Sequence, residues 1–332
     1  MTRLILTFTD SGAGGLKAAR LADCVVGVEQ RFVCGKLPPS SELDALFSPR
    51  AASYRAGAHW LDNLTGRLLE DAHRQGLGLI EFCERFDAVD LWGDPDPNSQ
   101  LQLIWLLNYL RPHASVASRL AILQADLIIG EREPAELAAW QPRLAPVRGH
   151  QFEVASAAWA AWGASTPEAW FNLLTQELRA LPQLRNSVVA LLEELPARGS
   201  GLGATEMRML ELLSAGQVHP YDLFPGHEKP NTRRTFGYWE TGALLEGLAR
   251  CPMPAISGLD EGPFDLDMHE DPERHQRYKR SRLALTGLGK AIVAGSGDFS
   301  QYNPIHRWSG GTELTNETLW RWDAGSRTLV AP

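Results

Sequence analysis

The first third of the chain alternates short apolar runs with longer amphipathic segments. The runs at 4–8, 24–28, 89–92 and 120–123 are rich in apolar, mostly branched side chains, which is typical of strands buried on both faces. Stretches of helical periodicity separate these runs. Strands that alternate with helices in this way predict a parallel sheet covered by helices. We therefore expect residues 1–130 to form a Rossmann-like α/β domain.

Between the runs, glycine, proline and aspartate predict where turns and helices begin. The segment 10–15 (DSGAGG) predicts a turn that is followed by a helix. Pro49 predicts the start of a long amphipathic helix. The apolar face of this helix would include Trp60, Leu64, Leu68 and Leu69. The breaker run 93–97 ends the third strand, and we expect Asn98 or Ser99 to cap the next helix.

The pattern changes after residue 130. Residues 131–198 have helical patterning without a strand signal, and we expect them to be a helical connector. For 199–332 we expect three helices, at 204–214, 220–224 and 236–249, two short strands, at 254–257 and 282–285, and a helix capped by Thr286. This order predicts a winged-helix-like domain, and a hairpin is expected around Gly310 and Gly311. The fold class is thus an α/β sheet domain followed by a helical, winged-helix-like C-terminal domain.

Composition narrows the class of protein. The 332 residues include 32 Lys and Arg against 40 Asp and Glu, a formal net charge of −8, which excludes a general attraction to nucleic acid or anionic membranes. Four widely spaced cysteines predict neither a disulfide framework nor a zinc site. The longest near-apolar stretch, 101–110, is too short for a membrane span, and the N-terminus has the pattern of a strand rather than of a signal peptide. We expect a cytoplasmic protein without a membrane partner.

Candidate ligand-binding residues follow the first strand, in Thr9–Lys17 (TDSGAGGLK). The backbone could approach a ligand closely at Gly12, Gly14 and Gly15. The N-terminus of the following helix would offer unpaired N–H groups and a positive dipole end, which suit an anion. Asp10 and Ser11 would lie at the carboxyl edge of the sheet, where open α/β sheets bind ligands, with Lys17 nearby. The glycine spacing does not match the dinucleotide fingerprint, and the alternative is a tight turn without a ligand.

A second group of candidates follows the third strand. Trp92 ends this strand, and Asp94, Asp96 and Gln100 come directly after it. The carboxyl ends of parallel strands lie at one edge, so we expect these carboxylates to converge with that of Asp10. Convergent carboxylates can act as acid and base or hold Mg²⁺. Further ligand contacts are expected from Arg50 and Arg55. The alternative is an Asp/Pro turn that only caps the next helix.

Two polar segments lie between the short strands predicted near the C-terminus. Residues 265–271 and His275 are of types that bind metals, but their spacing fits no metal-site pattern, so we expect a solvated loop and assign no metal. Residues 274–282 carry five basic side chains at the place of a wing, which could contact DNA phosphates. The expected recognition helix, 236–249, has the composition of a buried helix, which argues against DNA contact.

Motifs spread along the chain resemble those of one family. They are Thr9-Asp10-Ser11, Trp92 with Asn98-x-Gln100-Leu101, Ala158-Trp159 with Thr166-Pro167, Leu195-Pro196 with Gly201-Leu202, Leu285-Thr286-x-x-Gly289-Lys290-Ala291, and Ile305-x-Arg307-Trp308-x-Gly310-Gly311 through Trp320-Arg321-Trp322-Asp323. From residue 4 to 323 the chain is similar to the bacterial proteins known as "domain of unknown function 1835", joined to a C-terminal companion domain. The resemblance implies a two-part architecture and supplies no reaction.

The chain departs from this family at two places. The first loop of the family more often has Gly-Asp-Ser, where this chain has Thr9 in place of the glycine. The second strand of the family is usually followed by an acidic pair, where this chain continues with residues 31–36 (RFVCGK). If those acids are catalytic in the family, the resemblance implies a lost or changed activity here.

We therefore expect a binding protein or an enzyme that takes an anionic small molecule at the carboxyl edge of its α/β sheet. In this hypothesis Ser11 and the loop amides hold the anion, Lys17 neutralises it, and Asp10 with Asp94 acts as acid and base or as metal ligands. The C-terminal domain would cover the site or form a homodimer, and no particular cofactor is indicated. The alternative is a winged-helix adaptor or regulator that contacts a protein partner or DNA through 274–282. The negative net charge favours the first hypothesis.

Overall fold

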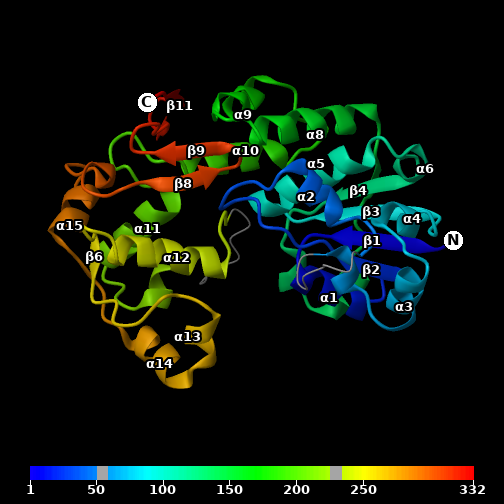
Figure 1. The fold of residues 1–332 in the computed structure, drawn as a ribbon, viewed down its shortest axis with the longest axis horizontal. Helices are drawn as coiled ribbons and strands as arrows, with labels where there is room; N and C mark the ends of the chain where they lie inside the picture. The colour runs from blue at the N-terminus through cyan, green and yellow to red at the C-terminus, as the bar shows by residue number, and fades with distance from the viewer. Residues whose placement is uncertain (51–58, 225–233) are drawn as a thin grey trace. The chain divides into compact units, whose positions relative to one another are not determined.

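The computed structural model describes residues 1–50, 59–224 and 234–332, drawn in Figure 1. These residues form two compact units. Unit 1 contains Met1–Phe32, Leu37–Gly163 and Asn172–Ser187, and unit 2 contains Val33–Lys36, Ala164–Phe171 and Val188–Pro332. The stretch 131–198, which we expected to be a separate connector, is divided between the two units.

Unit 1 is built on a mixed sheet, five-stranded within the described residues. The strands are β1 (Arg3–Thr7), β2 (Cys24–Gly27), β3 (Ala88–Gly93), β4 (Leu120–Gln124) and β5 (Ala145–Pro146), in the order β2-β1-β3-β4-β5. The first four are parallel, which confirms the predicted parallel α/β sheet, and β5 is antiparallel to β4. The β5 strand corrects our expectation of no strand in this region. Its two residues are exposed, so they carry no hydrophobic signal that sequence analysis could detect.

Helices surround this sheet in the order that the alternating pattern predicts. They are α1 (Asp10–Ala18), α2 (Ser40–Ala45), η1 (Trp60–Asn63), α3 (Gly66–Arg74), α4 (Leu79–Cys83), α5 (Pro97–Leu110), α6 (Ala114–Ala117), η2 (Ile129–Glu131), α7 (Pro134–Ala139), α8 (Gly149–Trp162) and η3 (Leu173–Thr175). The chain reverses its direction across the sheet between β1 and β3, and in open α/β sheets ligands bind at the carboxyl ends of the strands beside such a reversal.

Two predicted boundaries in unit 1 are wrong. The 10–15 run is the start of α1 rather than a turn, because the Thr9 Oγ1 accepts the N–H of Gly12 at 3.1 Å and caps the helix. Trp60 and Leu68 do not share a helix, because Leu64 and Thr65 between η1 and α3 are extended, and α3 begins at Gly66 with a φ of +57°.

The cap of α5 is Asp96 rather than Asn98 or Ser99. Its Oδ1 accepts the Ser99 N–H at 3.1 Å, and Pro97 occupies the first helical position, where its missing N–H costs nothing. The alternative reading of the Asp/Pro turn as a helix cap therefore holds for Asp96.

Unit 2 is mostly helical and carries three two-stranded pairs in the described residues. Its elements after α9 (Glu168–Asn172) and α10 (Leu184–Glu193) are α11 (Ala204–Ser214), η4 (Pro220–Leu223), α12 (Tyr238–Ala249), β6 (Ile256–Ser257), α13 (Leu266–Glu270), α14 (Pro272–Arg280), β7 (Ala284–Leu285), α15 (Gly287–Val293), η5 (Phe299–Gln301), β8 (His306–Ser309), β9 (Thr312–Thr315), β10 (Arg321–Asp323) and β11 (Thr328–Val330).

Several predictions for unit 2 are confirmed, and one is corrected. The short strands β6 and β7 pair, Thr286 caps α15, and β8 and β9 form a hairpin at Gly310-Gly311. The connection from β6 to β7 is not an extended wing, because Asp265 and Asp271 cap two helices within it, α13 and α14. The pair β10–β11 is an addition that we did not predict. Among the described helices none combines the length and the apolar character that crossing a membrane requires.

An ion pair between a buried carboxylate and a half-buried guanidinium group stabilises unit 2. The guanidinium group of Arg307 donates two hydrogen bonds to the carboxylate of Glu206, at 2.9 and 3.2 Å. Glu206 is 4% exposed and also accepts the N–H of Gly203 at the start of α11. The geometry is the bidentate one that makes arginine–carboxylate pairs strong.

Candidate functional site

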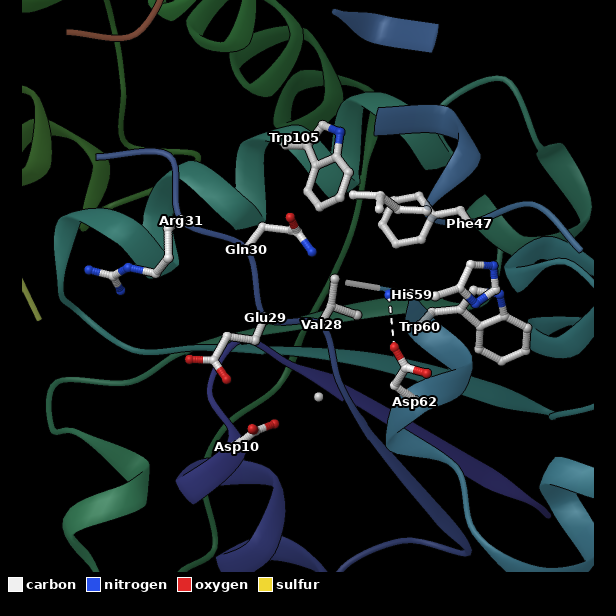
Figure 2. Close-up of a pocket in the computed structure, with 12 residues that line it drawn as sticks. Asp10, Val28, Glu29, Gln30, Arg31, Phe47, His59, Trp60, Asp62 and Trp105 are labelled. Carbon is white, nitrogen blue, oxygen red and sulfur yellow. Dashed lines mark hydrogen bonds between the residues drawn. The ribbon is translucent and has the colours of Figure 1, made fainter. Parts of the chain in front are cut away.

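A cavity of about 340 Å³ opens beside the carboxyl ends of β1 and β2 in unit 1 (Figure 2). It is lined by Asp10, Gly27, Val28, Glu29, Gln30, Arg31, Leu46, Phe47, His59, Trp60, Asp62 and Trp105. Its volume lies within the ordinary range for small-molecule sites. The deep walls are aromatic and almost fully buried: Phe47 is 1%, Trp60 2% and Trp105 2% exposed. The carboxyl groups of Asp10 and Glu29 lie on one side of it.

Glu29 and Asp10 form a carboxyl pair at this cavity. Glu29 is the second residue after β2, and its carboxyl group lies beside that of Asp10 (Figure 2). Partial burial and the neighbouring Asp10 carboxylate raise the pKa of Glu29 above its usual range, against a smaller opposing effect of Arg31. Two neighbouring carboxyl groups resist joint ionisation, so one of them keeps its proton more tightly than the other. The pair therefore offers a proton donor and a proton acceptor at one place.

This carboxyl pair lies at the N-terminus of α1. The carboxyl group of Glu29 lies near the backbone N–H of Asp10, and the N–H of Gly12 donates to the Thr9 Oγ1 at 3.1 Å. The positive end of the helix dipole therefore faces a carboxylate of the protein itself. This carboxylate and the use of the Gly12 amide by Thr9 both disfavour a phosphate at this helix end.

Two polar side chains of α5 hold the segment that carries Glu29. The Asn98 Oδ1 accepts the N–H of Phe32 at 2.9 Å, and its Nδ2 donates to the carbonyl of Gln30 at 2.8 Å. The Gln102 Oε1 accepts the N–H of Gln30 at 2.7 Å. Asn98 and Gln102 are one helical turn apart, so they point from the same face of α5, and both are almost fully buried. Side chains of α5 thus hold the segment 28–32 through its backbone N–H groups and through one of its carbonyl groups.

The side of the cavity away from the carboxyl pair is formed by η1 and by His59, which precedes it. The Nδ1 of His59 accepts the N–H of Leu61 at 3.2 Å, so its Nε2 carries the proton that bonds the carbonyl of Ser48 at 2.8 Å. Burial lowers the pKa of His59, which keeps the ring neutral. Asp62 accepts hydrogen bonds from the His59 N–H and from Arg50, the latter at 2.5 Å. The predicted ligand residue Arg50 is therefore paired with Asp62, and Arg55 lies outside the described residues.

Asp94 is placed in a different environment from Asp10. It is 2% exposed, and its Oδ1 accepts the N–H of Ile129 in η2 at 3.0 Å. Burial and the nearby charges of Asp96 and Glu131 raise its pKa to about 7. Asp94 does not belong to the lining of the cavity. Its contact anchors the η2 segment instead.

The same η2 segment packs on the start of α1. A Cβ atom added to Gly130 would clash with the side chain of Ser11 and lie 3.0 Å from the backbone nitrogen of Gly12. Ser11 is exposed, and it contacts η2 rather than lining the cavity. Glycine at 130 permits this close approach, which covers the helix end where we expected a ligand.

The remaining predicted ligand residues lie apart from the cavity lining. Trp92 is a core residue, 2% exposed and packed edge-on against Trp140 with ring centroids 5.8 Å apart. Gln100 is fully buried, and its Nε2 donates to the carbonyl of Asp94 at 2.7 Å. On α1, Gly14 and Lys17 are exposed, while Gly15 packs against Leu137.

Of the predicted site residues that the structure describes, Asp10 alone lines the cavity. Its partner Glu29 was not among the residues predicted for the site. A signal was present, because Glu29 follows the second strand directly and the carboxyl ends of parallel strands share an edge.

The acidic segment of unit 2 with its histidines is structural in this arrangement. Its aspartates cap α13 and α14, as described above. The Nε2 of His275 bonds the hydroxyl of Tyr221 at 2.9 Å, and that of His269 bonds Tyr238 at 3.2 Å. No cluster of three or more His, Cys, Asp or Glu side chains suited to a metal occurs in the described ranges.

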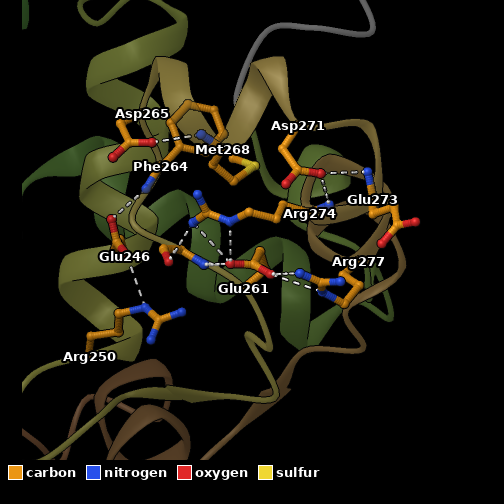
Figure 3. A network of polar contacts seen from close by, with 11 residues as sticks. Glu246, Arg250, Glu261, Phe264, Asp265, Met268, Asp271, Glu273, Arg274 and Arg277 are labelled. Atoms are coloured by element: carbon orange, nitrogen blue, oxygen red, sulfur yellow. Dashed lines mark hydrogen bonds and ion pairs between the residues drawn. The ribbon is translucent and has the colours of Figure 1, made fainter.

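The basic segment 274–282 is also partly neutralised. Figure 3 shows Glu261 between Arg274 and Arg277, with ion pairs of 3.1 and 2.8 Å to these two guanidinium groups. Lys279, Arg280 and Arg282 are exposed. The segment lies mainly on α14, whose buried residue Tyr278 faces the interior of unit 2.

In comparisons with known proteins, no family model matches the chain, and neither does any curated protein.

Proposed function

We propose that unit 1 binds a small molecule at the carboxyl edge of its sheet, in the cavity beside Asp10 and Glu29. The observation that carries the proposal is the carboxyl pair, which lies on a cavity of ligand size with aromatic inner walls. Carboxylates accept hydrogen bonds, so they favour a ligand with hydroxyl or amino groups on this side.

A ribose-bearing molecule such as a nucleoside fits this chemistry. By analogy, in dinucleotide-binding α/β folds an acidic residue that follows a strand accepts hydrogen bonds from the ribose hydroxyls. Glu29 occupies a comparable place after β2. The phosphate position of those folds has no counterpart here, because the Glu29 carboxyl group lies beside the N-terminus of α1, Thr9 accepts the N–H of Gly12, and Gly130 packs on Ser11. We therefore favour a nucleoside or sugar over a nucleotide.

The carboxyl pair also supports an enzyme. One carboxyl group that retains a proton beside one that is ionised can act as general acid and general base on the same ligand. Asp10 and Glu29 take these roles in the proposal, in place of the Asp10 and Asp94 pair expected from the sequence. An anionic ligand stays the second candidate, with Arg31 at the cavity as its counter-ion.

Thermal unfolding with a ligand panel tests the proposal. The panel contains adenosine, uridine, ribose, AMP and inorganic phosphate, for the wild type, Glu29→Gln and the control Glu70→Gln. Glu70 is an exposed residue of α3, so the control makes the same charge change away from the cavity. A ligand at about 100 times its Kd stabilises by roughly 2.7 kcal/mol.

We expect nucleosides to raise the Tm of the wild type and the control, and to raise that of Glu29→Gln less. Stabilisation by AMP and phosphate but not by adenosine would favour the anionic candidate. A panel without any effect would contradict both.

The alternative function, an adaptor or regulator that contacts a protein partner or DNA through 274–282, depends on interpreting unit 2 as a winged helix. It is supported by the order α11, η4, α12, β6, β7 and α15, with α13 and α14 inserted between the strands. Two of its five basic side chains are paired with Glu261, and α12 buries Leu245 and Leu248. These contacts favour the small-molecule proposal over DNA contact. Steeply salt-dependent DNA binding, weakened by neutralising Lys279 and Arg280, would reverse this preference.

A further inference from the structure

A second cavity of unit 1, of about 320 Å³, lies where α2, α5 and α8 meet. It is lined by Ser40, Leu43, Asp44, Trp105, Asn108, Tyr109, Pro112, His113 and Trp159. The motifs singled out in the sequence contribute Trp159 to it, and the proposed function does not use it. Figure 1 shows the three helices, and one residue, Trp105, belongs to the linings of both cavities.

Aromatic rings form the walls of this second cavity. The ring centroids of Trp105 and Trp159 are 6.4 Å apart with an angle of 38° between their planes. Phe47 supports the group from behind, stacked on Trp105 at 4.6 Å and tilted against Tyr109 at 4.6 Å. Trp159 and Tyr109 are half-buried, so part of each ring is accessible from the cavity. Ring faces carry negative electrostatic potential, which attracts cations.

Apart from Tyr109, the titratable side chains among the described residues that line this cavity are one carboxylate, Asp44, and one imidazole, His113. Asp44 of α2 is exposed at its edge, and the lining contains no lysine or arginine in the described part of the chain. Burial raises the pKa of Tyr109 to about 12, with smaller contributions from the carboxylates of Asp44 and Glu81. Only the contribution of the two carboxylates bears on the charge of a ligand, and it favours a cation near the Tyr109 hydroxyl.

We propose that the cavity formed by Trp105, Tyr109, Trp159 and Asp44 binds a small organic cation of the quaternary ammonium type. Aromatic rings around a single carboxylate are the chemistry that recognises such cations, because the rings attract the positive charge and the carboxylate neutralises it. A neutral sugar would be held by hydrogen bonds to Asn108 and Asp44 instead, and it is an outcome of the test. The proposal does not depend on the function of the first cavity.

Titration calorimetry with choline and tetramethylammonium tests this site. The control ligand is 3,3-dimethylbutan-1-ol, which has the shape of choline without its charge. The variants are Asp44→Asn and Trp159→Leu, with Glu42→Gln as the matched control. Glu42 is exposed on the same helix α2 and does not line the cavity.

We expect both cations to bind and the neutral alcohol to bind at least about tenfold more weakly. Asp44→Asn should weaken choline binding about tenfold, and Glu42→Gln should leave it unchanged. Circular dichroism establishes that each variant is folded. Equal affinity for the alcohol, binding of glucose in place of choline, or no effect of Asp44→Asn would each overturn the proposal. Absence of choline binding at millimolar concentration would do the same.

Discussion

The Oδ1 of Asp94 lies 3.0 Å from the backbone nitrogen of Ile129 and ties the end of β3 to η2. Burial raises the pKa of this carboxyl group to about 7, well above the ordinary value of 3.8. The folded protein therefore holds this proton more tightly than the unfolded chain does. The free energy of unfolding contributed by Asp94 falls as the pH rises from about 4 to about 7.

Asp94→Asn should remove this loss, because asparagine keeps the acceptor for Ile129 and does not ionise. We expect the variant to be more stable than the wild type at pH 8, by about 4 kcal/mol at most, and to differ less at pH 5. Urea unfolding at the two pH values measures this. Burial also raises the pKa of Glu194 to about 7, so the free energy of unfolding of both proteins still depends on pH. The prediction therefore concerns the difference in unfolding free energy between variant and wild type at each pH. The same pH dependence of the unfolding free energy in both proteins would contradict the prediction.

The carboxyl pair makes a prediction for titration. The pKa of Glu29 should lie above the usual glutamate range, because of partial burial and the charge of Asp10. Asp10→Asn removes that charge and should move the pKa of Glu29 downwards. Side-chain ¹³C NMR of labelled glutamate measures both values, with the exposed Glu70 as an internal reference. An unchanged pKa of Glu29 in the variant would show that the two groups are independent.

The bonds from α5 predict local changes in amide exchange. Asn98→Ala removes the acceptor of the Phe32 N–H, and Gln102→Ala removes that of the Gln30 N–H. Each variant should speed exchange at its own amide, by about tenfold or more, because a net hydrogen bond contributes about 1 kcal/mol or more when its loss leaves a buried group unpaired. Hydrogen exchange followed by NMR distinguishes the two sites. The amide of Leu6 in β1 serves as the control, and faster exchange there would indicate general destabilisation.

The ion pair of unit 2 predicts a large loss of stability. Arg307→Met leaves the carboxylate of Glu206 buried without its counter-charge, which should cost about 3–5 kcal/mol. Arg208→Met, which breaks an exposed pair with Glu211, should cost at most about 1 kcal/mol. Urea unfolding compares the two. In the double variant Glu206→Gln with Arg307→Met, the cost should be smaller than the sum of the single ones, and strict additivity would show that the pair is not coupled.

Much of the fold follows from local sequence signals. The four parallel strands are apolar runs buried on both faces, so composition and spacing were enough to predict them. The helix 204–214 and the Thr286 cap were also predicted, because the contacts that decide them lie within a few residues of each other along the chain.

One error at the site is local, and the other two arise from contacts between distant segments. The 10–15 run was interpreted as a turn from its glycines, yet Gly12 is buried and the Thr9 cap starts a helix there. The position of Glu29 after the second strand placed it at the shared edge, but its pairing with Asp10 depends on the register of β2 beside β1, which no local pattern specifies. The carboxylate of Asp94 was placed with that of Asp10 from the shared edge alone, whereas its bond to Ile129 is a tertiary contact of 35 residues' separation.

The two outer strands of the sheet, β2 and β5, differ in length, but neither is open to pairing with another strand. Strand β5 has two residues, and Pro146 carries no N–H, so Ala145 supplies the strand's single backbone donor. At the opposite side, all four residues of β2 are buried. Neither side presents a long exposed row of backbone N–H and C=O groups. Addition of a strand from another chain is therefore disfavoured, and association between copies of this sheet would have to use side chains.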